Sequence, residues 1–284
     1  MSPEASLLSG TDLLPEDLKG KVRVLEQSLG ALDRVMVAFS GGSDSALLAW
    51  MATQVLGKDR ATCRTAVSSS LATEELRDCE QLAVEWSLDW APIATDELDK
   101  PKYVENGSDR CYHCKTELMD KLLPEANSLG ATIVLGVNLD DLGDHRPGQD
   151  AAFEKGASFP LVDAGLTKDQ IRQVSKIAGL RTWNKPAAAC LASRIPYGTK
   201  VSIGLLAQVD HAEGALKSLG FSQLRVRHYG QTARIELDIQ EFGKAIDMRS
   251  EIVRVIKAAG FNYVTIDLEG FRSGNLNSEV NGAS

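Results

Sequence analysis

The stretch Ser40-Gly41-Gly42-Ser43-Asp44-Ser45 decides the fold. It follows the apolar run Val35-Met36-Val37-Ala38-Phe39 and precedes Ala46-Leu47-Leu48-Ala49-Trp50-Met51, so the pattern predicts a strand, a glycine turn and a helix. Adjacent glycines let the backbone adopt positive φ and approach a ligand, so several N–H groups can point at one anion. The N-terminal end of the helix adds positive potential. The stretch therefore predicts a phosphate-binding loop in which the serines supply hydroxyl donors and Asp44 holds Mg²⁺.

The motif Ser-Gly-Gly-x-Asp-Ser resembles the pyrophosphate loop (PP-loop) of the N-type ATP pyrophosphatases. This superfamily includes GMP synthetase, NAD synthetase and the tRNA thiolases. The resemblance implies that ATP is cut between its α and β phosphates and that AMP is attached to a substrate oxygen. Glycine-serine turns that bind nothing are the alternative, and this match is longer than such turns require. The Gly-Lys-Ser/Thr ending of a Walker loop is absent from the sequence, which disfavours transfer of the γ phosphate.

Composition bounds the class of protein. The 284 residues favour about two domains. The sequence has no run of about 18 apolar residues and no signal peptide in its first dozen residues, so we expect a soluble, cytoplasmic protein without a membrane partner. A net charge of −8 opposes nucleic-acid binding and suits a small anionic substrate. An odd, sparse set of five cysteines favours thiols or metal ligands over disulfides: Cys63, Cys79, Cys111, Cys114 and Cys190.

Strands and helices alternate in the first part of the chain, as a parallel sheet requires. Helix ends are marked by Pro15, by Gly57 and by a Thr167/Gln170 capping box, and further strands are expected near 62–67, 90–94 and 132–137. A polar loop is expected over 99–109. The pattern then changes to a helix at 202–219, strands at 224–229 and 233–237, a helix at 242–259 and a strand at 263–268, followed by a loose tail after Arg272. We therefore predict a first domain over 1–198 and a smaller α+β domain of the split type over 199–284.

Two stretches carry the informative cysteines. Arg110-Cys111-Tyr112-His113-Cys114-Lys115 holds two thiols separated by two residues, which can chelate one metal ion or cluster, form a redox pair, or be accidental. Cys190 lies among small residues between Pro186 and Pro196, so an irregular segment is expected there. A buried, inert thiol is the ordinary alternative for Cys190.

The strand near 132–137 leads into a polar run that ends at Gly148. Ligands gather beyond the carboxyl ends of strands in open α/β sheets, so this run should face the same cleft as the glycine loop. Asp141 and Asp144 could complete a metal or substrate site there together with Arg146. A solvated acidic turn is the alternative.

Taken together, the stretches 40–45, 110–115, 144–148 and 190–198 closely resemble the LarE family, the sulfur transferases of nickel-pincer cofactor biosynthesis. The likeness runs from the loop strand to about Ser273. It implies an α/β fold whose parallel sheet is of the adenine-nucleotide α-hydrolase (PP-loop) type, with a second, smaller α+β domain for substrate binding or oligomerisation. It also implies a homo-oligomer.

The resemblance implies a reaction on the small molecule pyridinium-3,5-biscarboxylic acid mononucleotide. ATP adenylates a carboxylate, and sulfur then displaces AMP to give a thiocarboxylate; a second round converts the other carboxylate. This order of steps is chemically sound, because a carboxylate resists nucleophiles whereas its mixed anhydride with AMP has an electrophilic carbon and a good leaving group.

The family contains two sulfur-donor strategies. One type sacrifices a cysteine near the position of Cys190, and the other resembles tRNA thiolases in which three cysteines hold a [4Fe-4S] cluster whose open iron carries sulfide. Cys111, Cys114 and Cys190 match the three-thiol pattern, so the resemblance favours the cluster and a sulfide donor. Sacrifice of Cys190 is the alternative, and structural zinc ranks below both. Cys63 and Cys79 are expected to be ordinary core or surface thiols.

The substrate's phosphate and carboxylates need cations. Arg225 and Arg227 are predicted on one face of a strand, with Arg234 and Glu236 on the next, and guanidinium groups suit bidentate phosphate contacts. A solvated basic strand is the alternative. The resemblance assigns phosphate contact to the segment Ser193-Arg194. It also matches Glu213 and Glu236 to family acids in contact with metal or substrate.

Two rival functions stay open at this point. A tRNA thiolase shares the ATP loop and three cysteines, but the acidic charge and the absence of flanking zinc-ribbon cysteine pairs from the sequence weigh against it. A non-catalytic adenine-nucleotide-binding module keeps the loop and performs no chemistry. It leaves the cysteine trio and the 144–148 stretch unexplained.

Overall fold

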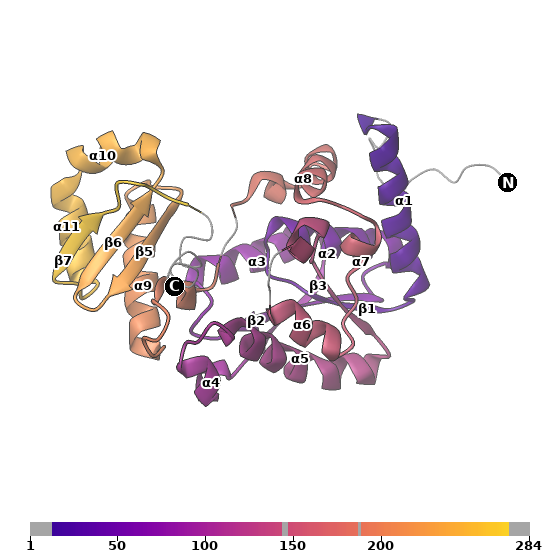
Figure 1. Cartoon of the computed structure of the whole chain (residues 1–284). Helices are drawn as coiled ribbons and strands as arrows, with labels where there is room; N and C mark the ends of the chain where they lie inside the picture. Colours follow the sequence, from indigo (N-terminus) through magenta and orange to yellow (C-terminus); the bar gives the residue numbers. More distant parts are fainter. Residues whose placement is uncertain (1–12, 144–146, 187–188, 273–284) are drawn as a thin grey trace. The chain divides into compact units, whose positions relative to one another are not determined.

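The computed structural model describes residues 13–143, 147–186 and 189–272 (Figure 1). Within these ranges the chain forms two compact units. The described parts of unit 1 are residues 13–67, 75–95, 111–143 and 147–186, and those of unit 2 are residues 68–74, 96–110 and 189–272. Two short segments from the first half of the chain thus belong to unit 2. The domain boundary predicted after residue 198 stays a prediction.

The strands and helices alternate largely as expected. The strands are β1 (Val35–Ala38), β2 (Ala61–Val67), β3 (Asp89–Ala94), β4 (Thr132–Leu135), β5 (Leu224–Tyr229), β6 (Thr232–Leu237) and β7 (Tyr263–Ile266). The helices are α1 (Glu16–Ala31), α2 (Ser43–Leu56), α3 (Thr73–Glu85), α4 (Pro101–Val104), α5 (Arg110–Leu129), α6 (Pro147–Glu154), α7 (Pro160–Asp163), α8 (Lys168–Ile177), α9 (Ile203–Ser218), α10 (Phe242–Asp247) and α11 (Arg249–Ala258). None of these described helices is long and apolar enough to cross a membrane.

Unit 1 is built on a parallel sheet with the strand order β3-β2-β1-β4. Side chains on a strand alternate between the two faces, and here both faces are buried. Val35 and Val37 pack into a core with α1, α2 and α8, while Met36 packs into a second core with α5. Helices therefore cover both faces of the sheet, as a parallel sheet requires. This arrangement confirms the predicted α/β class.

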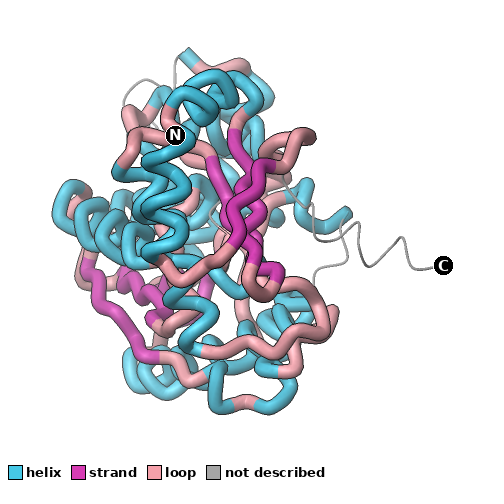
Figure 2. The backbone as a smooth tube through the Cα atoms, turned by 90° about the vertical axis from the view of Figure 1, so that its left-hand side faces the viewer, coloured by secondary structure: helices cyan, strands magenta, loops and turns pink. Residues whose placement is uncertain are grey.

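Unit 2 contains a three-stranded sheet with the order β5-β6-β7. The tube view of Figure 2 draws the strands of the chain in magenta. β5 and β6 are antiparallel, whereas β6 and β7 are parallel. The predicted split arrangement is wrong, because the chain returns through α10 and α11 to pair β7 directly with β6. The predicted helix over 242–259 is also two helices, since Met248 leaves the helical region at ψ 18°.

The loop expected over 99–109 is wrong in part, because α4 lies within it. Pro101 occupies the first turn of α4, where a proline costs no helical hydrogen bond and its fixed φ favours the helix. The irregular segment around Cys190 is confirmed, with a single 3₁₀ turn, η5 (Leu191–Arg194), among its described residues. The tail after Arg272 lies outside the described residues.

Candidate functional site

The glycine loop joins β1 to α2 at the carboxyl edge of the parallel sheet. Gly41 has a φ of +67°, which favours glycine. A Cβ atom on Gly41 would lie 2.8 Å from the Cys79 sulfur and 3.6 Å from Lys185 Nζ. Both the backbone conformation and the lack of space therefore require glycine at this position. Gly42 is the N-cap of α2 with an ordinary φ of −74°, so only one of the two glycines takes positive φ.

The serine hydroxyls of the loop are engaged within the loop itself. Ser45 Oγ donates to the Gly42 carbonyl over 3.2 Å and lies 3.0 Å from Ser40 Oγ. Ser43 Oγ donates to Asp44 Oδ1 over 3.3 Å. Ser43 and Ser45 are buried, whereas Ser40 is exposed. These hydrogen bonds stabilise the turn, so we expect the main role of Ser45 to be structural support of the loop.

Lys168, a residue that no sequence motif marks, reaches the loop from α8. Lys168 Nζ lies 2.7 Å from Asp44 Oδ2, and the backbone N–H of Lys168 donates to Asp140 Oδ2 over 2.8 Å. Lys168 therefore connects the glycine loop with the polar run after β4. This confirms that the run and the loop lie at the same edge of the sheet.

Gly136, directly after β4, brings this edge into close contact with α2. A Cβ atom on Gly136 would lie 2.6 Å from the backbone nitrogen of Ser45. Asp141 is buried, and its carboxylate accepts from the Asn138 backbone N–H over 3.2 Å. Asp141 thus stabilises the turn, and the solvated-turn alternative is wrong for it. Asp144 and Arg146 lie outside the described residues.

A second lysine, Lys185, lies close to Gly41, with its Nζ 3.6 Å from the position that a Cβ atom on this glycine would take. Its ammonium is 2.7 Å from Glu75 and 2.6 Å from Asp78, both on α3. Burial alone lowers the pKa of this lysine, but the hydrogen bonds to Asp78 and Glu75 outweigh burial and raise the pKa above its ordinary value. The ion pairs fix the chain next to Gly41, five residues before Cys190.

Cys111 and Cys114 lie in the first turn of α5, in unit 1. Residues three apart share one face of a helix, so both thiols can reach one ligand. Cys111 is exposed and Cys114 is partly exposed. Gly148 of α6 packs on this turn, since a Cβ there would lie 3.0 Å from the Cys111 carbonyl oxygen.

Cys190 is partly exposed and precedes η5 in unit 2. Side chains satisfy the backbone of the irregular segment that carries it. Arg110 donates to the Ala192 carbonyl over 2.9 Å, and Asn106 Nδ2 donates to the Pro196 and Thr199 carbonyls over 2.8 and 2.9 Å. Among the described residues, no group of three His, Cys, Asp or Glu side chains is placed to hold a metal ion.

The two other cysteines are chemically different from these three. Cys63 and Cys79 are buried in the core of unit 1. Burial raises the pKa of Cys63 to about 12 and that of Cys79 to about 11. A thiol, not a thiolate, is then present at neutral pH, and the thiolate is the form that binds metals. The prediction that Cys63 and Cys79 are ordinary thiols is consistent with this burial.

The arginines and glutamates predicted to bind substrate meet in unit 2. Arg227 forms two hydrogen bonds with Glu236, of 2.9 and 3.0 Å, and a third with the Ser193 carbonyl over 2.6 Å. Arg194 contacts Glu213 through two bonds of 2.8 and 3.0 Å. Arg227 and Glu236 are at most 1 % exposed, so the solvated-strand alternative is wrong.

Arg225 differs from its neighbours. It is 5 % exposed, donates to the Arg272 carbonyl over 3.2 Å and stacks on the Phe271 ring. Burial, followed by the nearby guanidinium groups of Arg194 and Arg227, lowers the pKa of Arg225 to about 10. Among the described side chains, no carboxylate forms a hydrogen bond or ion pair with Arg225, although Glu236 and Glu213 are close enough to raise its pKa in part.

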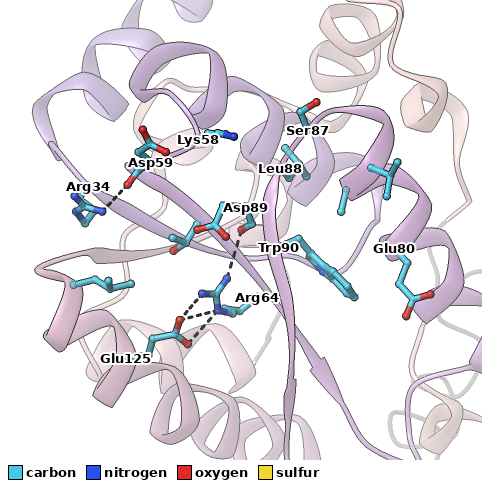
Figure 3. A pocket seen from close by; sticks show the side chains of 14 residues that line it. Arg34, Lys58, Asp59, Arg64, Glu80, Ser87, Leu88, Asp89, Trp90 and Glu125 are labelled. Carbon is cyan, nitrogen blue, oxygen red and sulfur yellow. Dashed lines mark hydrogen bonds and ion pairs between the residues drawn. The ribbon is translucent and has the colours of Figure 1, made fainter.

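A separate pocket of about 900 Å³ lies at the amino ends of β1, β2 and β3 (Figure 3). Arg34, Lys58, Asp89 and Trp90 line it, and Arg64 pairs there with Glu125. It contains none of the predicted site residues, and its charges are mixed. The glycine loop lies at the opposite, carboxyl edge of the same sheet.

Comparison with known protein sequences finds relatives of this chain, although no family model matches it. A pyridinium-3,5-bisthiocarboxylic acid mononucleotide synthase of Lactiplantibacillus plantarum is 38% identical over 264 residues, which cover 93% of this chain and 96% of the relative. The chain belongs to the LarE family. That relative is named as a synthase, so the LarE family is a family of enzymes and the chain is one of them.

Two further relatives extend the LarE comparison. An uncharacterized protein of Synechocystis is 45% identical over 264 residues, covering 92% of this chain and 98% of the relative. An uncharacterized protein of Methanocaldococcus jannaschii is 28% identical over 241 residues, covering 84% and 91% of the two chains.

Within this LarE chain, the structure brings some predicted residues together. Ser193, Arg194, Arg227 and Glu236 form one network, and Cys111 and Cys114 share one helical turn. Lys168, Lys185 and Asn106 were missed, because a single lysine or asparagine carries no motif. A lysine at the start of a capped helix, after an acidic turn, is the signal that could have pointed to Lys168.

Proposed function

We propose that the chain is an ATP-dependent sulfur transferase that adenylates the carboxylates of pyridinium-3,5-biscarboxylic acid mononucleotide and converts them to thiocarboxylates. The observation that carries this proposal is the 38% identity, over 93% of the chain, to a synthase named for the bisthiocarboxylic product. The glycine loop, the arginine network and the accessible thiols each support one part of this reaction.

ATP would bind at the glycine loop. The positive φ of Gly41 and the immediate start of α2 at Ser43 suit the approach of phosphates to backbone N–H groups. Asp44, in the first turn of α2, fits a Mg²⁺ ion because carboxylate oxygen is the ligand that this ion prefers. In the reaction, a substrate carboxylate oxygen attacks the α phosphorus, the bond to the β phosphate breaks, and pyrophosphate leaves.

The substrate's anionic groups would bind in unit 2. Arg225 is a buried cation that lacks a carboxylate partner among the described residues, whereas Arg194 and Arg227 are already matched by glutamates. We therefore assign the direct anion contact to Arg225. The strand β5 and the segment around Ser193 are held in place around Arg225 by the paired residues Arg194, Arg227, Glu213 and Glu236.

Sulfur would be delivered through Cys111, Cys114 and Cys190. The donor set fits a [4Fe-4S] cluster in its chemistry, because these three thiols are accessible while Cys63 and Cys79 are buried with raised pKa values. Such a cluster supplies an iron site that can take up and release sulfide. The alternative is that Cys190 gives up its own sulfur and becomes dehydroalanine. We further expect a cytoplasmic homo-oligomer that receives sulfide from a separate donor.

The reaction can be tested directly. The protein is incubated anaerobically with the biscarboxylic mononucleotide, ATP, Mg²⁺ and sulfide, and the products are analysed by mass spectrometry. We expect a mass gain that corresponds to replacement of oxygen by sulfur, together with AMP and pyrophosphate. Asp44→Ala should abolish pyrophosphate release, and Asp59→Ala, an exposed aspartate outside the loop, is the control. ATP cleavage to ADP in the wild type would contradict the proposal.

The sulfur source needs a second experiment. Protein purified without oxygen is assayed for iron and acid-labile sulfide, as wild type and as Cys111→Ala, Cys114→Ala and Cys190→Ala, with Cys63→Ala as the buried control. About four irons per chain, lost in the three variants and kept in the control, support the cluster. If the wild type holds no iron and loses the mass of one H₂S at Cys190 during turnover, sacrifice of Cys190 is the donor instead.

A further inference from the structure

We propose that Lys168 is a nucleotide-binding residue of the glycine loop, whose ammonium group moves from Asp44 to the β phosphate side of ATP when Mg²⁺·ATP binds. This inference rests on the proposed function. It adds a contact to the pyrophosphate leaving group that no sequence motif of the loop supplies.

The backbone of Lys168 is held firmly in place by its neighbours. Its backbone N–H bonds to Asp140, and it starts α8, whose N-cap Thr167 forms a capping box with Gln170. Lys21 of α1 donates in turn to Gln170 Oε1 over 2.8 Å and to the Gly165 carbonyl over 2.7 Å. The base of the Lys168 side chain therefore stands on a rigid support while its ammonium group reaches the loop.

The ammonium group lies where the metal–phosphate complex is expected. It is 2.7 Å from Asp44 Oδ2, and the side chains of Lys168 and Asp44 are 33% and 16% exposed. The pair is thus accessible to a ligand from solvent. Mg²⁺ prefers the same carboxylate oxygens that now accept from Lys168, so binding of the metal to Asp44 weakens or replaces this ion pair. The released ammonium then lies beside the phosphates that the metal carries.

A lysine in this place has a chemical use in the proposed reaction. When the bond between the α phosphorus and the bridging oxygen breaks, negative charge develops on the departing pyrophosphate. An ammonium group next to that oxygen stabilises the charge electrostatically and needs no proton transfer. Lysine also suits an exchange of partners, because its charge is compact and its stem is flexible.

Lys185, the other lysine beside the loop, is not suited to the same role. Its ammonium contacts two carboxylates, Glu75 and Asp78, and its side chain is only 16% exposed. Moving it to a phosphate would leave both acids without this partner. Lys168 has to leave one carboxylate, and Mg²⁺ compensates that carboxylate on arrival.

The test measures nucleotide affinity rather than turnover. Binding of α,β-methylene ATP, which resists cleavage between the α and β phosphates, is measured by calorimetry in Mg²⁺ for the wild type, Lys168→Ala and Lys168→Arg. AMP, which lacks the pyrophosphate, is measured in parallel. The matched control is Lys155→Ala, which removes a similarly exposed lysine that pairs with Asp120 outside the loop.

We expect Lys168→Ala to weaken binding of the ATP analogue by about tenfold or more, as for loss of one charged hydrogen bond, while AMP affinity falls by a much smaller factor. Lys168→Arg should restore much of the affinity, and Lys155→Ala should resemble the wild type. Unchanged affinity for the analogue, or equal loss for the analogue and AMP, overturns the role of Lys168. If the wild type binds no ATP analogue, the proposed function itself fails.

Discussion

At the scale of single residues, the buried arginines of unit 2 fall into two kinds. Arg194 and Arg227 each face a glutamate that takes two of their hydrogen bonds. Arg225 is equally buried, and it donates a hydrogen bond to the backbone carbonyl of Arg272. A buried charge is tolerated when it is paired and is costly when it is not. The same residue type therefore serves the fold at two positions and, we infer, the ligand at the third.

Replacing Arg225 and Arg227 by glutamine separates these roles. Arg227→Gln removes both bonds that this guanidinium gives to the buried Glu236 carboxylate, so we expect the free energy of unfolding to fall by about 3 kcal/mol. Arg225→Gln should change it by less than about 1 kcal/mol, and should remove the stabilisation that the mononucleotide gives the wild type. Urea unfolding with and without the ligand measures both quantities. Equal destabilisation by the two variants contradicts the distinction.

We expect His228 to make the stability of unit 2 depend on pH. The side chain is 5 % exposed, contacts Phe261 and lies 3.2 Å from Gln208 Oε1, and burial lowers the pKa of the imidazole below 6.5. The neutral form is therefore favoured in the folded protein. Its stabilising contribution is complete above the pKa of the unfolded state and is lost as the pH falls towards the folded pKa.

We expect the wild type to lose more stability than His228→Gln between about pH 7.5 and about pH 5. The glutamine keeps an amide that can bond to Gln208 and does not titrate. Carboxylates elsewhere titrate equally in both proteins, so the difference between their unfolding free energies isolates His228. A difference that stays constant over this range, or that grows in favour of the wild type at low pH, contradicts the assignment.

At the scale of elements, the approach of β4 to α2 positions the glycine loop. Gly136 has no space for a Cβ, since that atom would lie within 3 Å of the backbone of Asp44 and Ser45. Backbone atoms cannot move aside as the end of a flexible side chain can. The start of α2 and the end of β4 are therefore fixed relative to each other.

Gly136→Ala should push α2 away from the sheet. We expect a loss of about 1–3 kcal/mol in the free energy of unfolding, as for overpacking of a core, and a marked loss of affinity for α,β-methylene ATP. Gly20→Ala is the control, because Gly20 lies inside α1 with no atom within 4 Å of its Cβ position. That change should stabilise the protein by about 0.5–1 kcal/mol. Normal affinity in the Gly136→Ala variant would show that the contact does not position the loop.

The elements that sequence predicts well have local signals. The apolar spacing of Leu18, Val22, Leu25 and Leu29 gives α1, and the Thr167/Gln170 box gives the start of α8. Lys168 contacts Asp44, which lies more than a hundred positions away, and Arg227 contacts Glu236 on the neighbouring strand. No local sequence pattern contains either contact. The helix α5 carries Pro124 in its interior, a residue that usually ends helices, and its extent was not predicted.

At the scale of the whole molecule, the net charge of the chain and the burial of two of its arginines together favour a small anionic substrate over a nucleic acid. The chain carries a net charge of −8, and the two arginines of the expected basic strand, Arg225 and Arg227, are buried in unit 2. A nucleic-acid binder needs exposed cations along the phosphate backbone. Buried cations suit a small anion, which can enter a site that a duplex or a folded tRNA cannot.

This distinction separates the proposed LarE-type reaction from that of a tRNA thiolase. We expect no binding of bulk tRNA in a gel-shift assay at about 0.15 M salt, where weak surface electrostatics are screened, and no competition by tRNA with the mononucleotide. Arg225→Gln should weaken mononucleotide binding and leave the tRNA result unchanged, because a side chain as buried as Arg225 cannot contact the phosphate backbone of a folded RNA. Saturable tRNA binding that falls steeply with salt, and that competes with the mononucleotide, would instead favour a nucleic-acid substrate.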